Sequence, residues 1–263
     1  MNNNEGEGDI EIMISRILGG ILTIACIISL FLNITVLLTL WFGSFLNTKQ
    51  SGIYIFAFAN IFGNCFTVII FGGYLGPAIM AQNSLFSSLV PWPKFLGFLF
   101  HIQWFQDMFL QITTAINRLI AVVNPRASHF FTRKMIIGLV LGCYILGLIF
   151  AIIAGYLLPC CALYLYWRKF SFYYIDKSFN YADNILDWPI NSIASIIPIF
   201  CYIRIYLYVK TSNKKVITTI AESKAAERKS KETKYALQFA ACTGFSICND
   251  MGKLSYISVV FSR

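Results

Sequence analysis

Long apolar segments alternate with short polar connections along the chain. They cover residues 17–42, 52–80, 95–123, 135–158 and 185–209, and a weaker one covers 235–261. A helix needs about 20 apolar residues to cross about 30 Å of hydrocarbon, and the first five segments are long enough. The pattern predicts an all-α integral membrane protein. Its single transmembrane domain, residues 17–263, follows a polar N-terminal segment, residues 1–16.

Composition and charge support a membrane location. Hydrophobic residues make up 57% of the 263 residues and charged residues 13%, whereas soluble proteins have about 45–50% and about 25%. The net charge of +9 could indicate nucleic-acid binding, but the cations gather in the connections at 124–134 and 210–234. Cytoplasmic loops of membrane proteins carry such clusters. The sequence therefore predicts an extracellular N-terminus, cytoplasmic basic loops and no nucleic-acid partner.

The connection between the fourth and fifth spans, residues 160–183, is rich in aromatic side chains. Two runs, LYLYW and FSFYY, flank Arg168 and Lys169. Aromatic runs separated by a short polar pair favour a β-hairpin over a helix. We therefore expect an aromatic hairpin between these spans.

The third span ends in the sequence LQITTAINRLIAVVNP, residues 110–125. An arginine in a membrane-length helix is costly unless it reaches water, a headgroup or a partner, so Arg118 marks an interface or a function. Asn117, Arg118, Leu119, Val122 and Pro125 resemble the D-R-Y-x-x-V-x-x-P signature of rhodopsin-like G-protein-coupled receptors. The phrase INRLIAVVNP and the basic, aromatic loop after it resemble the nematode serpentine receptor class X (Srx) chemoreceptors more closely. An ordinary helix end with an interfacial arginine is the alternative.

Three further positions fit the resemblance. Asn33 stands where the superfamily keeps a first-helix asparagine, and Asn60 stands where it keeps a second-helix aspartate. Tyr206 follows Pro198 at the spacing of a proline and a tyrosine in the fifth helix. The resemblance implies a role in activation and G-protein coupling for four residues: Asn117, Arg118, Pro125 and Tyr206.

One carboxylate, Asp107, lies within the third span. A lone carboxylate in lipid costs about 2.5–3.5 kcal/mol on insertion scales, so it should face the bundle and find partners. At about 1.5 Å per residue, Asn33, Asn60 and Asp107 are expected at a similar depth, and we predict that they form one polar cluster. Similar receptors have a sodium-binding, activation-linked network there, with its carboxylate on the second helix. A protonated Asp107 that serves only packing is the alternative.

A ligand pocket is expected beneath the aromatic hairpin. Membrane-bundle sites combine apolar walls with a few polar anchors. The candidates on the third and fifth spans are Gln103, Trp104, Asn191, Ser192 and Ser195. Most of the aromatic side chains could instead lie at the lipid interface, where tyrosine and tryptophan collect.

The chain also departs from the receptor pattern. No cysteine occurs between Cys65 and Cys143, so the bridge that ties the third helix to the second outer loop in most such receptors cannot form. The last span lacks the typical tryptophan and proline, and no seventh helix with an N-P-x-x-Y motif follows. We therefore expect a rhodopsin-like seven-helix bundle truncated after about six transmembrane helices. A shortened isoform or gene model that differs over residues 250–263 would explain this.

The resemblance implies a chemosensory G-protein-coupled receptor that binds a small extracellular molecule and couples to a heterotrimeric G protein. Its expected location is the plasma membrane, in a sensory cilium, and its partners include other receptor copies. A small transporter or channel subunit and a non-signalling partner of full-length receptors are the alternatives. The scarcity of ionisable residues in the spans argues against transport. His101 and His129 lie apart and the eight cysteines are scattered, so no enzyme, metal site or cofactor is expected.

Overall fold

The structure is a computed structural model that describes residues 3–47, 51–83, 92–124, 131–158, 163–174 and 180–216. The chain divides into two compact units. The first comprises residues 1–110 and 132–190, and the second comprises residues 111–131 and 191–263. The predicted weak span at 235–261 and Pro125 lie outside the described residues.

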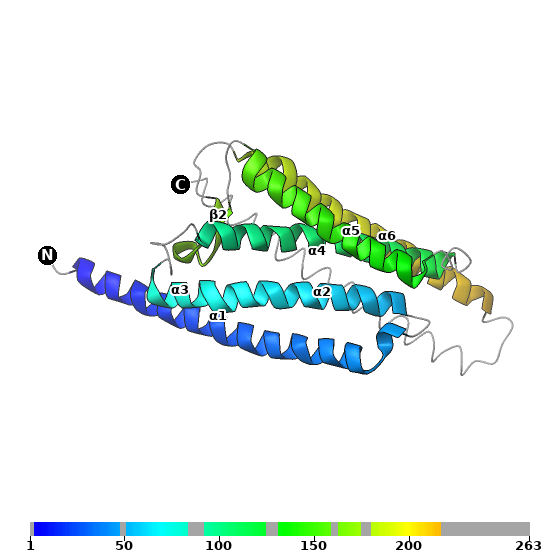
Figure 1. Cartoon of the computed structure of the whole chain (residues 1–263), viewed down its shortest axis with the longest axis horizontal. Helices are drawn as coiled ribbons and strands as arrows, with labels where there is room; N and C mark the ends of the chain where they lie inside the picture. The colour runs from blue at the N-terminus through cyan, green and yellow to red at the C-terminus, as the bar shows by residue number, and fades with distance from the viewer. Residues whose placement is uncertain are drawn as a thin grey trace. The chain divides into compact units, whose positions relative to one another are not determined.

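Two long antiparallel helices begin the first unit (Figure 1). α1 (Asn3–Phe42) leads through η1 (Phe45–Asn47) to α2 (Ser51–Ile70), which continues as η2 (Phe71–Leu75) and α3 (Gly76–Ala81). Gly72 lies directly against Cys26, and the rings of Phe58 and Trp41 are 6.1 Å apart. α1 starts well before residue 17, because its helix extends into the acidic N-terminal residues.

Four stretches of the described residues are long and apolar enough to cross a membrane: Ile12–Phe42, Gly52–Ala81, Arg133–Leu157 and Ala182–Thr211. α4 (Trp92–Val123) is long enough but more polar. All the buried polar side chains among the described residues lie on it, namely His101, Gln103, Gln106 and Asn117. A helix whose polar faces pack on protein tolerates such residues. Mean hydropathy alone therefore underestimates how well α4 suits a membrane span.

Two glycines let neighbouring elements approach α4 closely. A Cβ at Gly97 of α4 would lie 2.1 Å from the carbonyl oxygen of Leu163. A Cβ at Gly147 of α5 (Arg133–Ile152) would lie 2.8 Å from the carbonyl oxygen of Ile102 and 2.9 Å from the backbone nitrogen of Gln106. All three distances are shorter than van der Waals contact. α4 therefore lies close to β1 (Leu163–Tyr166) near Gly97 and close to α5 near Gly147.

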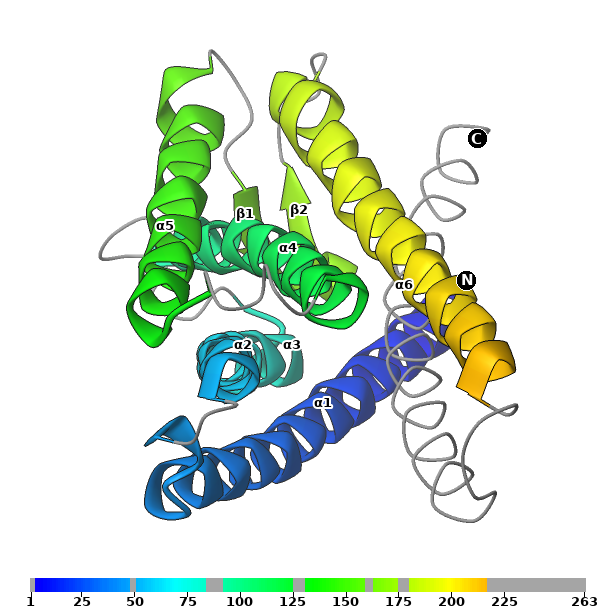
Figure 2. The same ribbon diagram turned by 90° about the vertical axis from the view of Figure 1, so that its right-hand side faces the viewer.

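The predicted hairpin is confirmed. β1 (Leu163–Tyr166) and β2 (Ser171–Tyr174) pair antiparallel beside α4, with Leu163 opposite Tyr174 (Figure 2). η5 (Trp167–Lys169) and Phe170, whose φ is 54°, form the turn. Leu163 and Leu165 enter a buried apolar cluster with Phe100 of α4. Within the first unit, the hairpin therefore packs against α4.

The remaining described helices complete both units. α5 begins after Thr132, whose hydroxyl accepts a hydrogen bond from the Met135 nitrogen at 3.4 Å, and continues as η4 (Ile153–Leu157). η6 (Ala182–Asp187) leads into α6 (Trp188–Val216), which runs through Pro198 without a break. The described part of the second unit consists of residues 111–124, residue 131 and residues 191–216.

Candidate functional site

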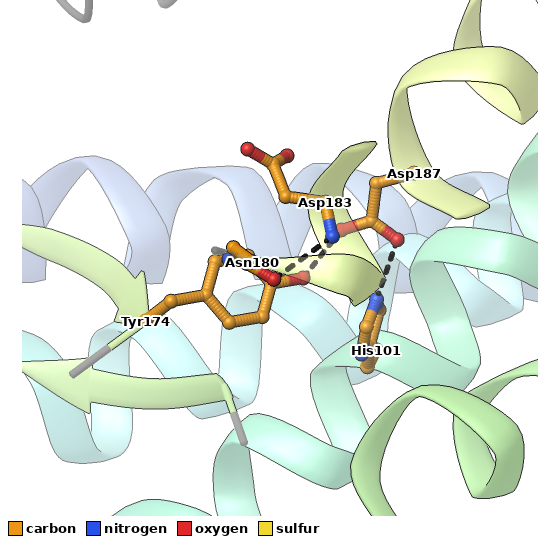
Figure 3. Close-up of polar contacts among 5 residues, drawn as sticks. All are labelled: His101, Tyr174, Asn180, Asp183 and Asp187. Atoms are coloured by element: carbon orange, nitrogen blue, oxygen red, sulfur yellow. Dashed lines mark hydrogen bonds and ion pairs between the residues drawn. The ribbon is translucent and has the colours of Figure 1, made fainter. Parts of the chain in front are cut away.

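Side chains from three elements of the first unit meet at one carboxylate (Figure 3). Nε2 of His101 on α4 lies 3.1 Å from Oδ1 of Asp187, the last residue of η6. The hydroxyl of Tyr174, at the end of β2, donates to Oδ2 of Asp187. These three residues are termed the hairpin link. It is a hydrogen-bonded unit, and no group of three or more His, Cys, Asp or Glu in the described ranges could hold a metal ion.

The hairpin link is largely shielded: His101 is buried, and Tyr174 and Asp187 are partly buried. The side chain of His101 is 4% exposed and that of Asp187 is 16% exposed. The His101 ring stacks on Phe105 at 4.6 Å, and Phe105 packs in a buried cluster with Ala151 and Ala182. A buried polar group that loses its partner costs far more than an exposed one. His101 and Tyr174 therefore each depend on Asp187 for a hydrogen-bond partner.

Asn180 shapes the segment that presents Asp187. Its Oδ1 accepts a hydrogen bond from the backbone nitrogen of Asp183 at 3.0 Å (Figure 3). Its carbonyl oxygen accepts one from Nδ2 of Asn184 at 2.8 Å. These bonds satisfy groups at the start of η6, as capping residues do. η6 is a π-helix, a form that often occurs at functional sites. It places Asp187 seven residues beyond Asn180, within hydrogen-bond distance of His101.

Tyr174 acts as a hydrogen-bond donor. Burial raises the pKa of its hydroxyl, and the neighbouring carboxylate of Asp187 raises that pKa further. A phenolate beside a carboxylate would place two negative charges together in a poorly solvated site. Tyr174 therefore keeps its proton, whereas histidine is the residue type whose charge ordinarily changes between pH 5 and 8.

A small crevice reaches the hairpin link. Its lining residues are Lys94, Phe98, His101, Gly155, Tyr156 and Leu163, and it encloses about 230 Å³ including space open to the surroundings. The Nζ of Lys94 lies 5.6 Å from the centre of the Tyr156 ring. The space that a water-sized molecule can occupy is only about 10 Å³, whereas pockets for drug-sized ligands measure roughly 300–1,000 Å³. The crevice thus suits waters or a very small molecule.

Two predicted ligand contacts lie in the first unit. Gln103 is buried, and its Nε2 donates to Oε1 of Gln106 at 2.5 Å. Trp104 is partly buried, and its ring contacts those of Phe100 and Phe172 at 5.8 and 6.0 Å. Gln103 is therefore part of the packed interior, and Trp104 supports the hairpin.

The other three predicted ligand contacts lie on α6 in the second unit. Asn191, Ser192 and Ser195 are all partly buried. The Oδ1 of Asn191 is buried and has no hydrogen-bond partner among the described residues. It is a free acceptor in the second unit.

The predicted polar cluster does not form through direct hydrogen bonds in the described part of the chain. Asn33 is partly buried on α1, and Asn60 is exposed on α2. The contacts of Cys26 with Gly72 and of Trp41 with Phe58 set the register of the two helices. This register separates Asn33 from Asn60 by roughly 9 Å along the axis, at about 1.5 Å per residue. The cluster remains a prediction.

Asp107 has a different neighbour from those predicted. Its Oδ1 is buried without a hydrogen-bond partner in the described residues. Tyr144 of α5 lies within electrostatic reach, and its hydroxyl donates to the carbonyl oxygen of Ala59 at 3.3 Å. Tyr144 therefore brings a polar group of α5 to the Asp107 region.

The predicted coupling residues lie mainly in the second unit. Asn117 is buried and Arg118 is partly buried near the end of α4. Tyr202 of α6 is within electrostatic reach of Arg118. Tyr206 is 54% exposed, and Lys210 Nζ lies 5.9 Å from its ring centre. The tyrosine of α6 near Arg118 is thus Tyr202, which sequence reasoning missed.

Sequence reasoning also missed the hairpin link. A signal was present, because an ionisable residue inside a membrane segment needs a partner, and both His101 and Asp187 lie in predicted spans. The two residues are 86 positions apart. Periodicity cannot pair residues at that separation, so the contact needed the structure.

The fold is similar to that of squid rhodopsin. The crystal structure of squid rhodopsin matches with a TM-score of 0.67 and 17% sequence identity, over 88% of this chain and 67% of the rhodopsin chain. No curated protein sequence matches the chain. The likeness confirms the rhodopsin-like helical fold.

A family model described as serpentine type 7TM GPCR chemoreceptor Srx matches residues 23–262. This match covers nearly the whole chain, including the Asn117–Arg118 pair and the hairpin. It confirms the resemblance drawn from the third span. The chain belongs to the Srx family of serpentine seven-transmembrane chemoreceptors.

Proposed function

We propose that this protein is a chemosensory receptor that binds a small extracellular molecule and activates a heterotrimeric G protein. The family match over residues 23–262 carries this proposal. A ligand acts on such a bundle by binding one of its conformations more tightly than another. The signalling conformation then becomes more populated.

The N-terminus faces the outside of the cell, and the hairpin lies on the same side. The cation-rich connections at 124–134 and 210–234 support this orientation, because basic loops stay in the cytoplasm. Antibody labelling of epitope tags in intact cells tests it. A tag at the N-terminus should be labelled without permeabilisation, and a tag between residues 217 and 234 only after it. The reverse pattern would contradict the orientation. Labelling of a sensory cilium would support the expected location.

The coupling surface comprises two parts: Asn117, Arg118 and Pro125 at the end of the third span, and Tyr206 on α6. Support comes from Arg118, which is partly buried near Tyr202 of α6. Arginine suits such a role because its guanidinium stays charged and offers five donors. A shift of α6 would change the surroundings of Arg118. The basic connections could bind anionic headgroups at the same time.

Ligand contacts fall into two candidate groups. In the first unit, Gln103 and Trp104 lie on the part of α4 that supports the hairpin. In the second unit, Asn191, Ser192 and Ser195 lie together on α6. The buried Oδ1 of Asn191 has no partner in the described chain, so a ligand that donates a hydrogen bond would satisfy it. Substituting each group separately would show which one contacts the ligand.

A signalling assay in cells tests the proposal. Cells that express the protein with a G-protein biosensor receive a panel of small water-soluble and volatile molecules. The proposal predicts a saturable response to at least one molecule. Uptake of that molecule without a G-protein response would instead indicate a transporter. A response that requires a co-expressed full-length relative would indicate a non-signalling partner.

A further inference from the structure

We propose that the hairpin link is a proton-binding site, in which the charge on His101 sets how firmly the hairpin is attached to α4. Protonated His101 holds the hairpin closed on the first unit, and neutral His101 loosens it. This property belongs to the folded chain and does not rest on G-protein coupling.

The attachment of the hairpin to α4 is noncovalent. α4 contains no cysteine, so it cannot form a bridge to the hairpin connection. Gly97 lies against the Leu163 carbonyl, and Phe172 packs on Phe100 with ring centres 4.8 Å apart. Neither contact contains a group that titrates near neutral pH. The hairpin link is the titratable part of this attachment.

The charge balance at Asp187 explains why a proton matters. With His101 protonated, the 3.1 Å contact joins opposite charges and the buried pair is neutral overall. With His101 neutral, the carboxylate keeps its charge and has only hydrogen bonds from His101 and Tyr174. A buried charge without an opposite charge favours opening toward water. Because Tyr174 ends β2, that opening releases the end of the hairpin.

The other charges around His101 belong to the elements packed on it. Lys94, on α4, lines the same crevice and opposes uptake of a proton. Asp183, on η6, lies within electrostatic reach of Asp187 and Tyr174 and favours it. The crevice residues from η4 and β1, Tyr156 and Leu163, carry no charge near neutral pH. The two carboxylates of η6 thus outnumber the single lysine.

The crevice provides the route for the proton. His101 is part of its lining, although its side chain is only 4% exposed. In the proposal, the proton reaches the imidazole from this crevice.

Histidine-selective NMR on the purified full-length chain in nanodiscs tests the proton site. The chain has two histidines, so His101→Gln removes one signal and His129→Gln removes the other. Between pH 8 and pH 5 the His101 signal should change, and Asp187→Asn should alter that change because the attractive charge is gone. A His101 signal that does not change over this range would overturn the proposal.

Hydrogen exchange at residues 163–174 tests the attachment. After correction for the intrinsic rate, protection at pH 5.5 should exceed protection at pH 8.0 by about five- to tenfold, since a charge-assisted hydrogen bond is roughly twice as strong as a neutral one. His129→Gln should keep this difference, and His101→Gln should lose it. Tyr174→Phe should lose it while the His101 signal still changes with pH. Equal protection of the wild-type chain at both pH values would overturn the proposal, even where a variant fails to fold.

Discussion

His101 and Asp187 lie 86 positions apart in the sequence, and their side chains meet at 3.1 Å. The contact joins α4 to the end of η6. Because Asp187 also accepts the Tyr174 hydroxyl, it brings β2 into the same group. One carboxylate therefore organises the hairpin end of the first unit.

Removing that carboxylate should destabilise the protein. Asp187→Ala leaves buried His101 and partly buried Tyr174 without their acceptor, which should lower the free energy of unfolding by about 1–3 kcal/mol. Thermal unfolding can be followed with a dye that reacts with the buried thiols of Cys65 and Cys143 as they become exposed.

Asp183→Ala is the matched control for this substitution. The Asp183 carboxylate repels that of Asp187, and only its backbone nitrogen bonds to Asn180. The variant should unfold within about 0.5 kcal/mol of the wild-type chain. Equal losses in the two variants would show that Asp187 has no special role.

The close approach of α5 to α4 depends on Gly147. In Gly147→Ala the new methyl group would meet the α4 backbone at Ile102 and Gln106, and overpacking of this kind costs about 1–3 kcal/mol. Gly142, on the same helix, has open space where a Cβ would be. Gly142→Ala should therefore leave the melting temperature unchanged or higher. The dye assay measures both, and a loss only at Gly142 would refute the packing described for α5.

Alkaline pH should reduce the contribution of Tyr174 to the stability of the fold. Its hydroxyl has a raised pKa in the folded chain, whereas an unfolded tyrosine titrates near pH 10. The folded chain then binds the proton more tightly, so its stability falls as pH rises above about 10. Tyr174→Phe should show a smaller fall than wild type in melting curves between pH 9 and 11. Identical slopes would mean that Tyr174 titrates alike in both states.

Asp107→Asn separates packing from signalling. The Oδ1 of Asp107 is buried without a partner in the described chain, so removing the charge should raise the melting temperature by about 2–4 °C for each kcal/mol gained. If Asp107 belongs to an activation network, the ligand concentration for half-response should change by about fivefold or more. An unchanged response in the biosensor assay would assign Asp107 to packing alone.

The secondary structure could be predicted where the sequence has a strong local pattern. The aromatic runs around Arg168 predicted the hairpin, and apolar segments predicted the long helices. The three π-helical segments η2, η4 and η6 were not predicted, because one extra residue per turn does not change the apolar character of a segment.

The candidate site was harder to predict because it depends on register and on distant contacts. Counting residues from helix ends placed Asn33 and Asn60 at one depth, but the packing of Trp41 on Phe58 gives a different register. Likewise, the motif indicated Arg118, and only the structure places Tyr202 near it. Local signals therefore identified the polar residues, and tertiary packing determined their neighbours.

The most direct test of the receptor function is nucleotide exchange on a purified heterotrimeric G protein, with the reconstituted chain and a molecule that is active in cells. We predict that the wild-type chain accelerates exchange and that Arg118→Ala reduces this acceleration at least about tenfold, which corresponds to about 1.4 kcal/mol. The control substitution Arg204→Ala, at an exposed position of α6, should leave the acceleration intact. Exchange that is equally fast with Arg118→Ala, or that wild type never accelerates, would contradict the account.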